Sequence, residues 1–215
     1  MGDKIAVNAL MMDEHKAGIG NYAFQLFKAM EDMPLDFQID VHIQEHMKKY
    51  FNDRPNLNFI PHRDFKGSRD RILYEQLCMP FIYNKGGYEA VHFIDYLSPL
   101  IPVKAKRLFT FHDLAYFKLP QTFTFGSRLI KQFFTRWGVR KAAAVICVSH
   151  NTRKDLLERY PFLSKDRVRV IHLAGDPSPN FAEQKLGQDE NTLKKYGIYS
   201  KFILVVATLE PRKNI

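Results

Sequence analysis

Two glycines, Gly18 and Gly20, come just before a segment with helical periodicity, in which apolar residues recur every three or four positions over residues 19–30. A glycine loop at a helix N-terminus presents backbone N–H groups to a phosphate or a sugar. The run Gly-Ile-Gly-Asn-Tyr-Ala formally matches the dinucleotide fingerprint, but seven residues separate Leu10 from Gly18, where that fingerprint has a tight turn. We therefore favour a looser phosphate-binding or sugar-binding loop over an NAD site, with a plain turn as the alternative.

His112 and Asp113 follow a short apolar run, residues 107–111, that is typical of a buried strand. Ligands of parallel sheets bind beyond the carboxyl ends of the strands, so this position favours a functional role. The imidazole can hydrogen-bond a sugar hydroxyl or carbonyl, with Asp113 orienting it. The alternative is a structural histidine, which is the interpretation we favour for His42, His46 and His62.

Arg212 and Lys213 directly follow another apolar run, residues 202–207, and Glu210 precedes them. Two cations at the end of a strand suit a diphosphate, because arginine offers a forked pair of donors and lysine a point charge. A solvated turn is the alternative.

Short apolar runs alternate with helical patterns along the chain, which predicts an α/β fold: a Rossmann-like parallel sheet with helices on both faces. The expected strands are residues 4–10, 37–43, 57–60, 90–94, 107–111, 143–149, 167–173 and 202–207. The expected helices are residues 19–30, 70–83 and 127–142, and one that Ser149 or Asn151 caps and that runs to about Tyr160. In the second helix, the expected inward residues are Ile72, Leu73, Leu77 and Phe81.

Residues 176–191 are rich in Pro, Gly, Gln and Asp and lack apolar periodicity, which is typical of a linker. We predict a first domain over residues 1–175, a linker over 176–200 and the start of a second domain over 201–215. A buried strand with so little chain behind it suggests a truncated second domain.

The chain carries a net charge of +9, and the charge is concentrated. Residues 101–154 hold eleven Lys and Arg against one acid, Asp113. Such a field attracts phosphates of nucleotides, anionic lipids or nucleic acid. Nucleic acid is disfavoured as a partner, because no helix-turn-helix, zinc or RNA-binding signature accompanies the charge.

The expected helix over residues 127–142 is amphipathic and basic. Its apolar stripe is interpreted as part of the core. Its cations are expected to face solvent and to form a surface for an acceptor substrate or a membrane. The stripe comprises Leu129, Ile130, Phe133, Phe134 and Trp137, and the cations are Arg128, Lys131, Arg136 and Arg140. Attraction of these cations to an anionic membrane, helped by Phe123 and Phe125, is a second hypothesis for this region.

Hydrophobic residues make up 46% of the chain, a globular composition. The two cysteines, Cys78 and Cys147, suggest neither a disulfide framework nor a metal cluster. No apolar stretch reaches the ~18 residues that span a bilayer. We expect a cytoplasmic protein, with peripheral attachment to the inner face of the plasma membrane as an option.

Several motifs, taken together and in order, resemble the retaining glycosyltransferases of family 4. They are the glycine loop, Phe-His-Asp-Leu at residues 111–114, Val-Ser-His-Asn-Thr at 148–152, Val-Ile-His at 170–172 and Leu-Glu-Pro-Arg-Lys-Asn at 209–214. The resemblance implies a GT-B architecture, in which two Rossmann-like domains face across a cleft and this chain forms the N-terminal, acceptor-side half. The acidic residue pair of the family's second domain has no counterpart in the sequence.

The resemblance also implies roles for individual residues. Gly18 and Gly20 would line the cleft near the donor phosphates, and His112 would contact the transferred sugar. Arg212 and Lys213, beside Glu210, would neutralise the leaving diphosphate in place of a metal. No metal and no cofactor is expected, and no protein nucleophile is proposed, because retention in this family is attributed to front-face attack.

The function that follows is transfer of a mannose, rhamnose, glucose or galactose unit from a nucleotide-sugar to a polysaccharide or lipid-linked glycan, such as lipopolysaccharide. Because most of the nucleotide pocket would lie outside these residues, we expect the chain alone to be inactive. The alternative is a non-enzymatic Rossmann-like module that docks on an anionic membrane or on a partner domain.

Overall fold

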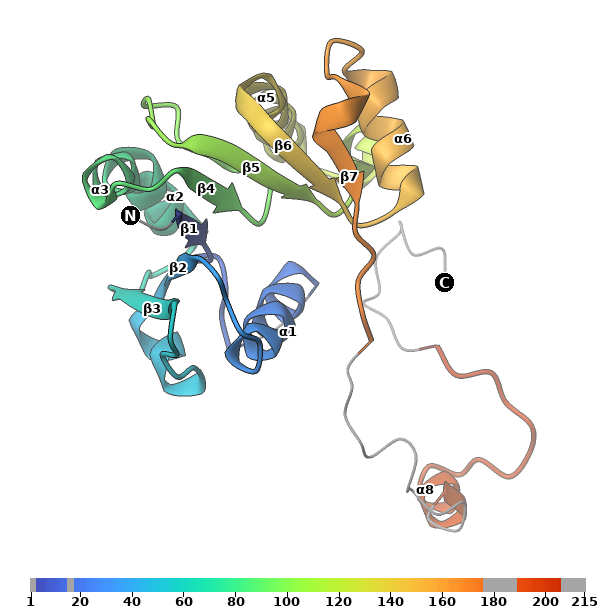
Figure 1. The fold of residues 1–215 in the computed structure, drawn as a ribbon. Coiled ribbons are helices and arrows are strands. Elements are labelled where there is room, and N and C mark those ends of the chain that lie inside the picture. The colour runs from blue at the N-terminus through green and yellow to red at the C-terminus, as the bar shows by residue number, and fades with distance from the viewer. Residues whose placement is uncertain (1–2, 15–17, 176–188, 206–215) are drawn as a thin grey trace. The chain divides into compact units, whose positions relative to one another are not determined.

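The structure is a computed structural model, and it describes residues 3–14, 18–175 and 189–205. The chain divides into two compact units, residues 1–173 and residues 174–215. The first unit contains the whole sheet described below (Figure 1). In the second, the described secondary structure is helix α8, Asp189–Lys195.

A seven-stranded parallel sheet forms the centre of the first unit, in the order β3-β2-β1-β4-β5-β6-β7. Its strands are β1 (Lys4–Asn8), β2 (Gln38–Gln44), β3 (Leu57–His62), β4 (Ala90–Phe93), β5 (Lys106–Phe111), β6 (Ala142–Cys147) and β7 (Val168–Val170). The order changes direction between β1 and β4. The Rossmann-like parallel sheet expected from the sequence is confirmed.

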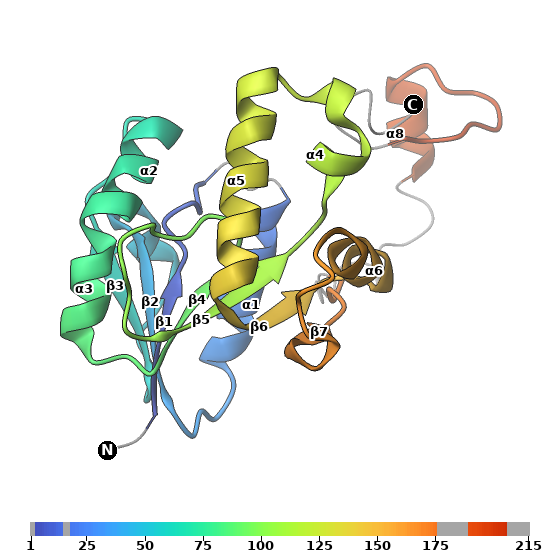
Figure 2. The ribbon, with the colours of Figure 1, turned by 90° about the horizontal axis from the view of Figure 1, so that it is seen from above.

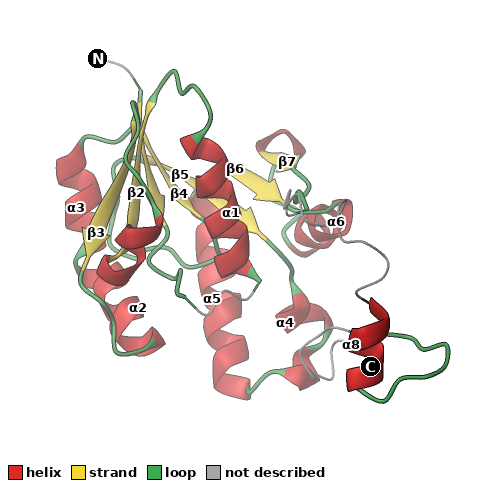
Figure 3. Cartoon of the chain, turned by 90° about the horizontal axis from the view of Figure 1, so that it is seen from below, coloured by secondary structure: helices red, strands yellow, loops and turns green. Residues whose placement is uncertain are grey.

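Helices cover both faces of this sheet (Figure 2). They are α1 (Ile19–Glu31), α2 (Ser68–Leu77), α3 (Met79–Gly86), α4 (Ala115–Lys118), α5 (Phe125–Lys141) and α6 (His150–Arg159). Short 3-10 turns occur at η1 (Glu45–Tyr50), η2 (Pro120–Thr122) and η3 (Lys165–Arg167). Colouring by secondary structure shows α1 beside the strands on the face away from α2 and α3 (Figure 3).

Two hydrophobic clusters correspond to the two faces. One joins α1 and η1 to β1, β2 and β3, with Phe27, Met47 and Phe59 fully or almost fully buried. The other joins α3, α4, α5 and α6 to β4, β5, β6 and β7, with Phe93 and Phe109 stacked at 5.2 Å between ring centroids. A parallel sheet buried on both faces is the physical reason for the continuous apolar runs in these strands.

The single helix expected over residues 70–83 is two helices, and its expected inward face is wrong. Pro80 prevents one continuous helix, because proline lacks the N–H group that a helix interior requires. It is accommodated in the first turn of α3. The side chains turned inward are those of Glu75, Met79 and Tyr83. Three of the four residues expected inside are more than half exposed: Leu73, Leu77 and Phe81.

The apolar stripe of α5 was expected to be core, and this too is wrong for most of it. The buried positions of α5 are Thr135, Gly138 and Val139, so small residues face the sheet. Gly138 lets the helix approach closely, since a Cβ atom there would lie 2.9 Å from Phe109 Cε1. Three of the five residues of the stripe are between 46% and 54% exposed: Leu129, Ile130 and Phe133.

The end of the described chain also differs from expectation. Strand β7 stops at Val170, and Ile171 and Leu173 are about half exposed. Residues 202–205 of the expected strand over 202–207 are not in a strand and are at least 50% exposed, because no described segment supplies the neighbouring ladder that a strand requires. Helix α8 lies within the expected linker, and residues 176–188 and 206–215 are outside the described residues.

Candidate functional site

The carboxyl edge of the sheet brings together the residues that follow β1, β4 and β5. Strand order changes direction between β1 and β4, so the connections that leave these two strands run to opposite faces. A crevice at such a switch point is where open parallel sheets bind ligands. His112, Asp95 and Asn8 all lie at this edge, at or just beyond the last residues of β5, β4 and β1.

His112 is held in one tautomer. Its Nε2 donates to the Ile94 carbonyl oxygen at 3.0 Å, and because a carbonyl can only accept, the proton sits on Nε2. Burial lowers the pKa of His112 below its ordinary value of 6.5, so the ring is neutral near pH 7. Among the described residues, no hydrogen-bond partner occupies Nδ1. The site therefore offers an unprotonated nitrogen that can accept a hydrogen bond from a hydroxyl group.

Tyr22 and Thr152 fix the position of His112. The Tyr22 ring meets the imidazole edge-on, with 4.9 Å between centroids. The Thr152 hydroxyl donates to the His112 carbonyl oxygen at 3.1 Å, and the Ser149 side chain caps α6 by accepting from the Thr152 backbone N–H at 3.0 Å. Ser149, one of the two expected caps, is confirmed. Tyr22 therefore contacts the ring of His112, and Thr152 holds its main chain.

Asp113 makes a different contact from the one expected. Its Oδ1 accepts a hydrogen bond from the Ala115 backbone N–H at 3.0 Å, at the start of α4. The His112 ring itself is hydrogen-bonded to the Ile94 carbonyl oxygen. Asp113 thus shapes the turn that leaves β5, and its negative charge opposes the lowering of the His112 pKa.

Gly18 and Gly20 occupy the start of α1, as the periodicity indicated. Gly18 is the residue before the helix and has φ +47°, a conformation that L side chains rarely adopt. Its carbonyl oxygen accepts the first helical bond, from the Tyr22 N–H at 3.0 Å. Gly20 is buried, and among the described residues nothing lies within 4 Å of an added Cβ. The glycine turn thus leads directly into the helix that carries Tyr22 to His112.

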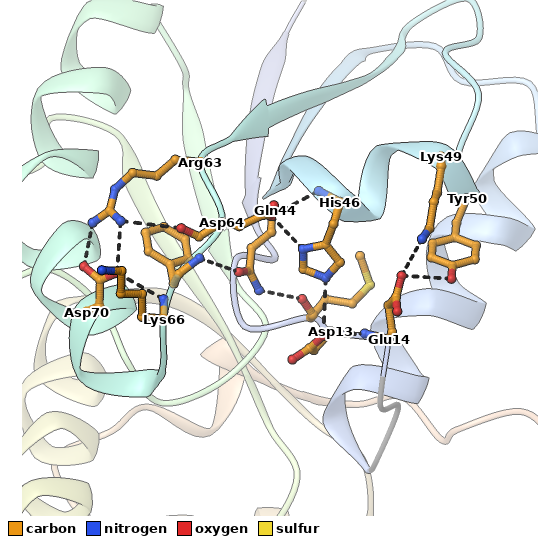
Figure 4. A network of polar contacts seen from close by, with 12 residues as sticks. Asp13, Glu14, Gln44, His46, Lys49, Tyr50, Arg63, Asp64, Lys66 and Asp70 are labelled. Atoms are coloured by element: carbon orange, nitrogen blue, oxygen red, sulfur yellow. Dashed lines mark hydrogen bonds and ion pairs between the residues drawn. The ribbon is translucent and has the colours of Figure 1, made fainter.

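A polar network ties the segment before this turn to the loops after β2 and β3 (Figure 4). His46 Nδ1 lies 2.6 Å from Asp64 Oδ1, and His46 Nε2 lies 3.3 Å from Asp13 Oδ1. Glu14 is paired with Lys49 and accepts a hydrogen bond from the Tyr50 hydroxyl at 3.2 Å. These contacts assign His46 a structural role in anchoring Asp13, while Lys49 and Tyr50 hold Glu14.

Sequence reasoning missed a buried carboxylate at the same edge. Glu75 is 2% exposed, pairs with Arg71 Nη1 at 2.9 Å and accepts from Asn8 Nδ2 at 3.2 Å. Burial raises the pKa of Glu75, and Arg71 opposes that shift. Burial also raises the pKa of Asp95 to about 6. Together with Asn8 these groups line a cavity of about 10 Å³, room for about one water molecule.

One signal in the sequence could have led to Glu75: an acidic residue in the middle of an apolar helix pattern. Asn8, the last residue of β1, has the same character of a polar side chain that ends an apolar run. Neither Asn8 nor Glu75 stands out in the sequence, because the two residues bond to each other across 67 positions of the chain.

The four cations expected to form one surface are divided by the structure. Lys131 Nζ donates to the Tyr96 hydroxyl at 2.9 Å and is half-buried. Arg128 is also half-buried, above the Phe125 ring. Arg136 and Arg140 are exposed on α5. Of the four cations, these last two are the exposed ones.

Glu210, Arg212 and Lys213 lie outside the described residues. Within the described ranges, no group of three or more His, Cys, Asp and Glu side chains is arranged to hold a metal ion. No helix there combines the length and apolar character that crossing a bilayer requires.

The comparison with protein families decides the assignment: the model of Glycosyltransferase Family 4 matches residues 17–178. The chain belongs to this family. The matched segment runs from the glycine turn through β7. It contains Gly18, Glu75 and His112 of the candidate site, whereas Asn8 precedes it. The resemblance that the motifs indicated is thereby confirmed.

Among solved structures, this family-4 chain is similar to a crystal structure of a glycosyltransferase from Rickettsia africae ESF-5, with 18% sequence identity and a TM-score of 0.47. The match covers 93% of this chain and 50% of the other, so the chain spans about half the length of that protein. No curated protein matches the chain.

Proposed function

We propose that this chain is the acceptor-side half of a retaining, metal-independent glycosyltransferase. The enzyme moves a mannose, rhamnose, glucose or galactose unit from a nucleotide-sugar to a polysaccharide or lipid-linked glycan. The observation that carries this proposal is the neutral imidazole of His112, held by Ile94 at the carboxyl edge with its Nδ1 unpaired among the described residues. A nitrogen that accepts hydrogen bonds suits a ligand with many hydroxyl groups, such as a sugar.

The position of Gly18 and Gly20 at the N-terminus of α1 supports a sugar diphosphate as the donor. The N-terminus of α1 carries the positive end of a helix dipole and free N–H groups, which suit an anionic ligand. The Gly18 turn brings backbone rather than side chain to this end of the helix. Arg212 and Lys213, with Glu210 beside them, are proposed to neutralise the departing diphosphate, and the support for their role is their place in the sequence.

The isolated chain is proposed to turn over no donor, because the resemblance to the family assigns most of the nucleotide pocket to a second domain. The test is release of nucleoside diphosphate from a panel of uridine, guanosine and thymidine diphosphate sugars, with EDTA present. The 215-residue chain is expected to release nothing. If the gene reads on past the codon for Ile215, the longer protein is expected to transfer with retention. Turnover by the short chain would contradict the inactivity. Absence of transfer by the longer protein with every donor would favour the non-enzymatic module.

A second function, peripheral attachment to an anionic membrane, is favoured by the exposed side of α5. Ile130 and Phe133 are more than half exposed, and Arg136 is exposed beside them on the same helix. Apolar side chains flanked by cations insert at the boundary between lipid headgroups and acyl chains. The helix would thus place the candidate site next to a lipid-linked acceptor.

The attachment is tested with vesicles of phosphatidylcholine, with and without phosphatidylglycerol. Binding is expected only with the anionic lipid, and it should fall as salt rises. The double variant Ile130→Ser/Phe133→Ser is expected to lose binding. The control is Leu73→Ser/Leu77→Ser, which removes two equally exposed apolar side chains from α2. Equal binding to both vesicles, or equal loss in both variants, would contradict the proposal.

A further inference from the structure

A cavity of about 590 Å³ lies at the amino edge of the sheet, where β5 and β6 begin. Its volume falls in the range of small-molecule sites. The walls come from the first residues of both strands, the last turn of α5 and the loop before β5. The polar and aromatic lining consists of Lys106, Arg107, Trp137, Arg140, Lys141 and Arg167.

The charge of this cavity is entirely positive. It is lined by five cationic side chains and no carboxylate. Within the described part of the chain, none of the five forms an ion pair. Five cationic side chains that line one concave surface with no carboxylate among them repel one another, and an anion in the cavity would reduce this repulsion.

Arg107 strengthens this argument because it is only 5% exposed. Its guanidinium donates to two neutral acceptors, the carbonyl oxygens of Pro99 at 2.7 Å and Ile101 at 3.2 Å. Burial without a carboxylate lowers the pKa of Arg107. A guanidinium has five N–H donors and a charge that is costly to bury unpaired, so both its remaining donors and its charge call for an anionic partner.

The indole of Trp137 forms one wall and is fixed in place. Its Nε1 donates to the same Pro99 carbonyl oxygen at 3.3 Å, and the Lys141 ammonium lies 5.3 Å from the ring centroid. The Pro99 carbonyl oxygen thus holds both the Trp137 indole and the Arg107 guanidinium beside the cavity. Arginine binds phosphate oxygens through its fork and lysine as a point charge, so phosphate is the anion that this mixture suits best.

We propose that this cavity is a binding site for a phosphate-bearing ligand, separate from the carboxyl-edge site. Strand β5 runs from Lys106 in the cavity to Phe111 beside His112, so the two places lie about 20 Å apart along the strand. A ligand bound here leaves the candidate site open. The phosphate belongs either to a soluble molecule or to a lipid headgroup at a membrane surface.

Trp137 is the single tryptophan of the chain, so its fluorescence reports on this cavity alone. Titration with inorganic pyrophosphate at low salt is expected to give a saturable change in emission. The double variant Lys141→Gln/Arg167→Gln should raise the dissociation constant at least tenfold. The charge-matched control is Arg69→Gln/Lys85→Gln, which removes one exposed arginine and one exposed lysine from α2 and α3 and should change the constant less than twofold.

A second arm uses phosphatidylglycerol vesicles with the same variants. Binding of pyrophosphate with the stated pattern identifies a soluble phosphate ligand. Binding of the vesicles but not of pyrophosphate, with loss in the cavity variant and not in the control, identifies a lipid phosphate. The proposal is overturned if neither probe binds, or if both double variants weaken binding to the same extent. Circular dichroism of each variant checks that it is folded.

Discussion

The imidazole of His112 and the backbone of Ile94 are joined across the carboxyl ends of β5 and β4 by a hydrogen bond of 3.0 Å. This bond puts the ring proton on Nε2 and leaves Nδ1 as an acceptor. The orientation of the candidate binding nitrogen is thus set by the main chain of the neighbouring strand. A side chain that cannot make this bond should lose function without loss of fold.

Replacing His112 with alanine removes both the acceptor and the contact with Ile94. If the proposed transferase activity is present, we expect kcat/KM to fall at least tenfold, with the free energy of unfolding changed by less than about 1 kcal/mol. His112→Asn, whose amide oxygen can stand near the position of Nδ1, should retain part of the rate. A change of less than twofold in the alanine variant would remove His112 from the site.

The two glycines at the start of α1 should respond differently to alanine. Gly18→Ala places a side chain at φ +47° and should cost about 1 kcal/mol or more of stability. Gly20→Ala meets no atom within 4 Å and should stabilise the helix by about 0.5–1 kcal/mol. Urea denaturation compares the two variants. Equal effects on unfolding would show that the Gly18 turn is not formed in solution.

Glu75 should be needed for stability. Glu75→Ala leaves Arg71 and Asn8 without their partner, and loss of about 3 kcal/mol is expected for breaking such a buried pair. Glu75→Gln keeps a hydrogen-bonding group and should cost less. Glu89→Ala, at an exposed position, is the control and should change unfolding by less than about 0.5 kcal/mol. If the Glu75 and Glu89 variants unfold alike, the buried network has no energetic role.

Gly138 tests the close packing of α5 on the sheet. An added methyl group would lie 2.9 Å from Phe109 Cε1, and Phe109 is fully buried and stacked on Phe93. Gly138→Ala should therefore destabilise the protein by about 1–3 kcal/mol. Gly126→Ala, in the first turn of the same helix with open space around it, should be neutral or stabilising. Thermal unfolding of the two variants decides the point, and a stabilised Gly138 variant would refute the packing.

Acid should destabilise the fold through His42. Burial lowers the pKa of His42 to about 3, and its Nδ1 lies 2.9 Å from His62 Nε2. The unfolded chain binds this proton near pH 6.5 and the folded chain does not, so stability is lost as the pH falls from 6.5 towards 3. The expected slope is about 1.4 kcal/mol per pH unit from this group. Unfolding at pH 7 and pH 5 measures it. In His42→Gln the difference should shrink by about 2 kcal/mol, and an unchanged difference would exclude His42 as its source.

The sequence by itself determined the alternation of strands and helices, the glycine turn before α1, the Ser149 cap and the place of His112 just after β5. These features depend on local chemistry: apolar runs, backbone freedom and capping hydroxyls act within a few residues. The motifs that resemble the family include the glycine turn, the segment of His112 and the segment of the Ser149 cap, so they too are local in sequence. The right-handedness of parallel crossovers restricts the possible topologies, but the order of the strands was not predicted and comes from the structure.

Only the tertiary structure decided which helix faces are buried and which polar groups meet. In α2 and α5, apolar side chains occur on more than one side of the helix, so periodicity alone could not identify the face that packs on the sheet. In the structure Glu75 and Gly138 are buried, whereas Leu77 and Phe133 are exposed. Glu75 is tolerated inside because Asn8 and Arg71 compensate its burial, and Asn8 lies 67 residues away. Contacts of that range depend on the folded backbone, because a buried charge is stable only where its partners have been brought within hydrogen-bond distance.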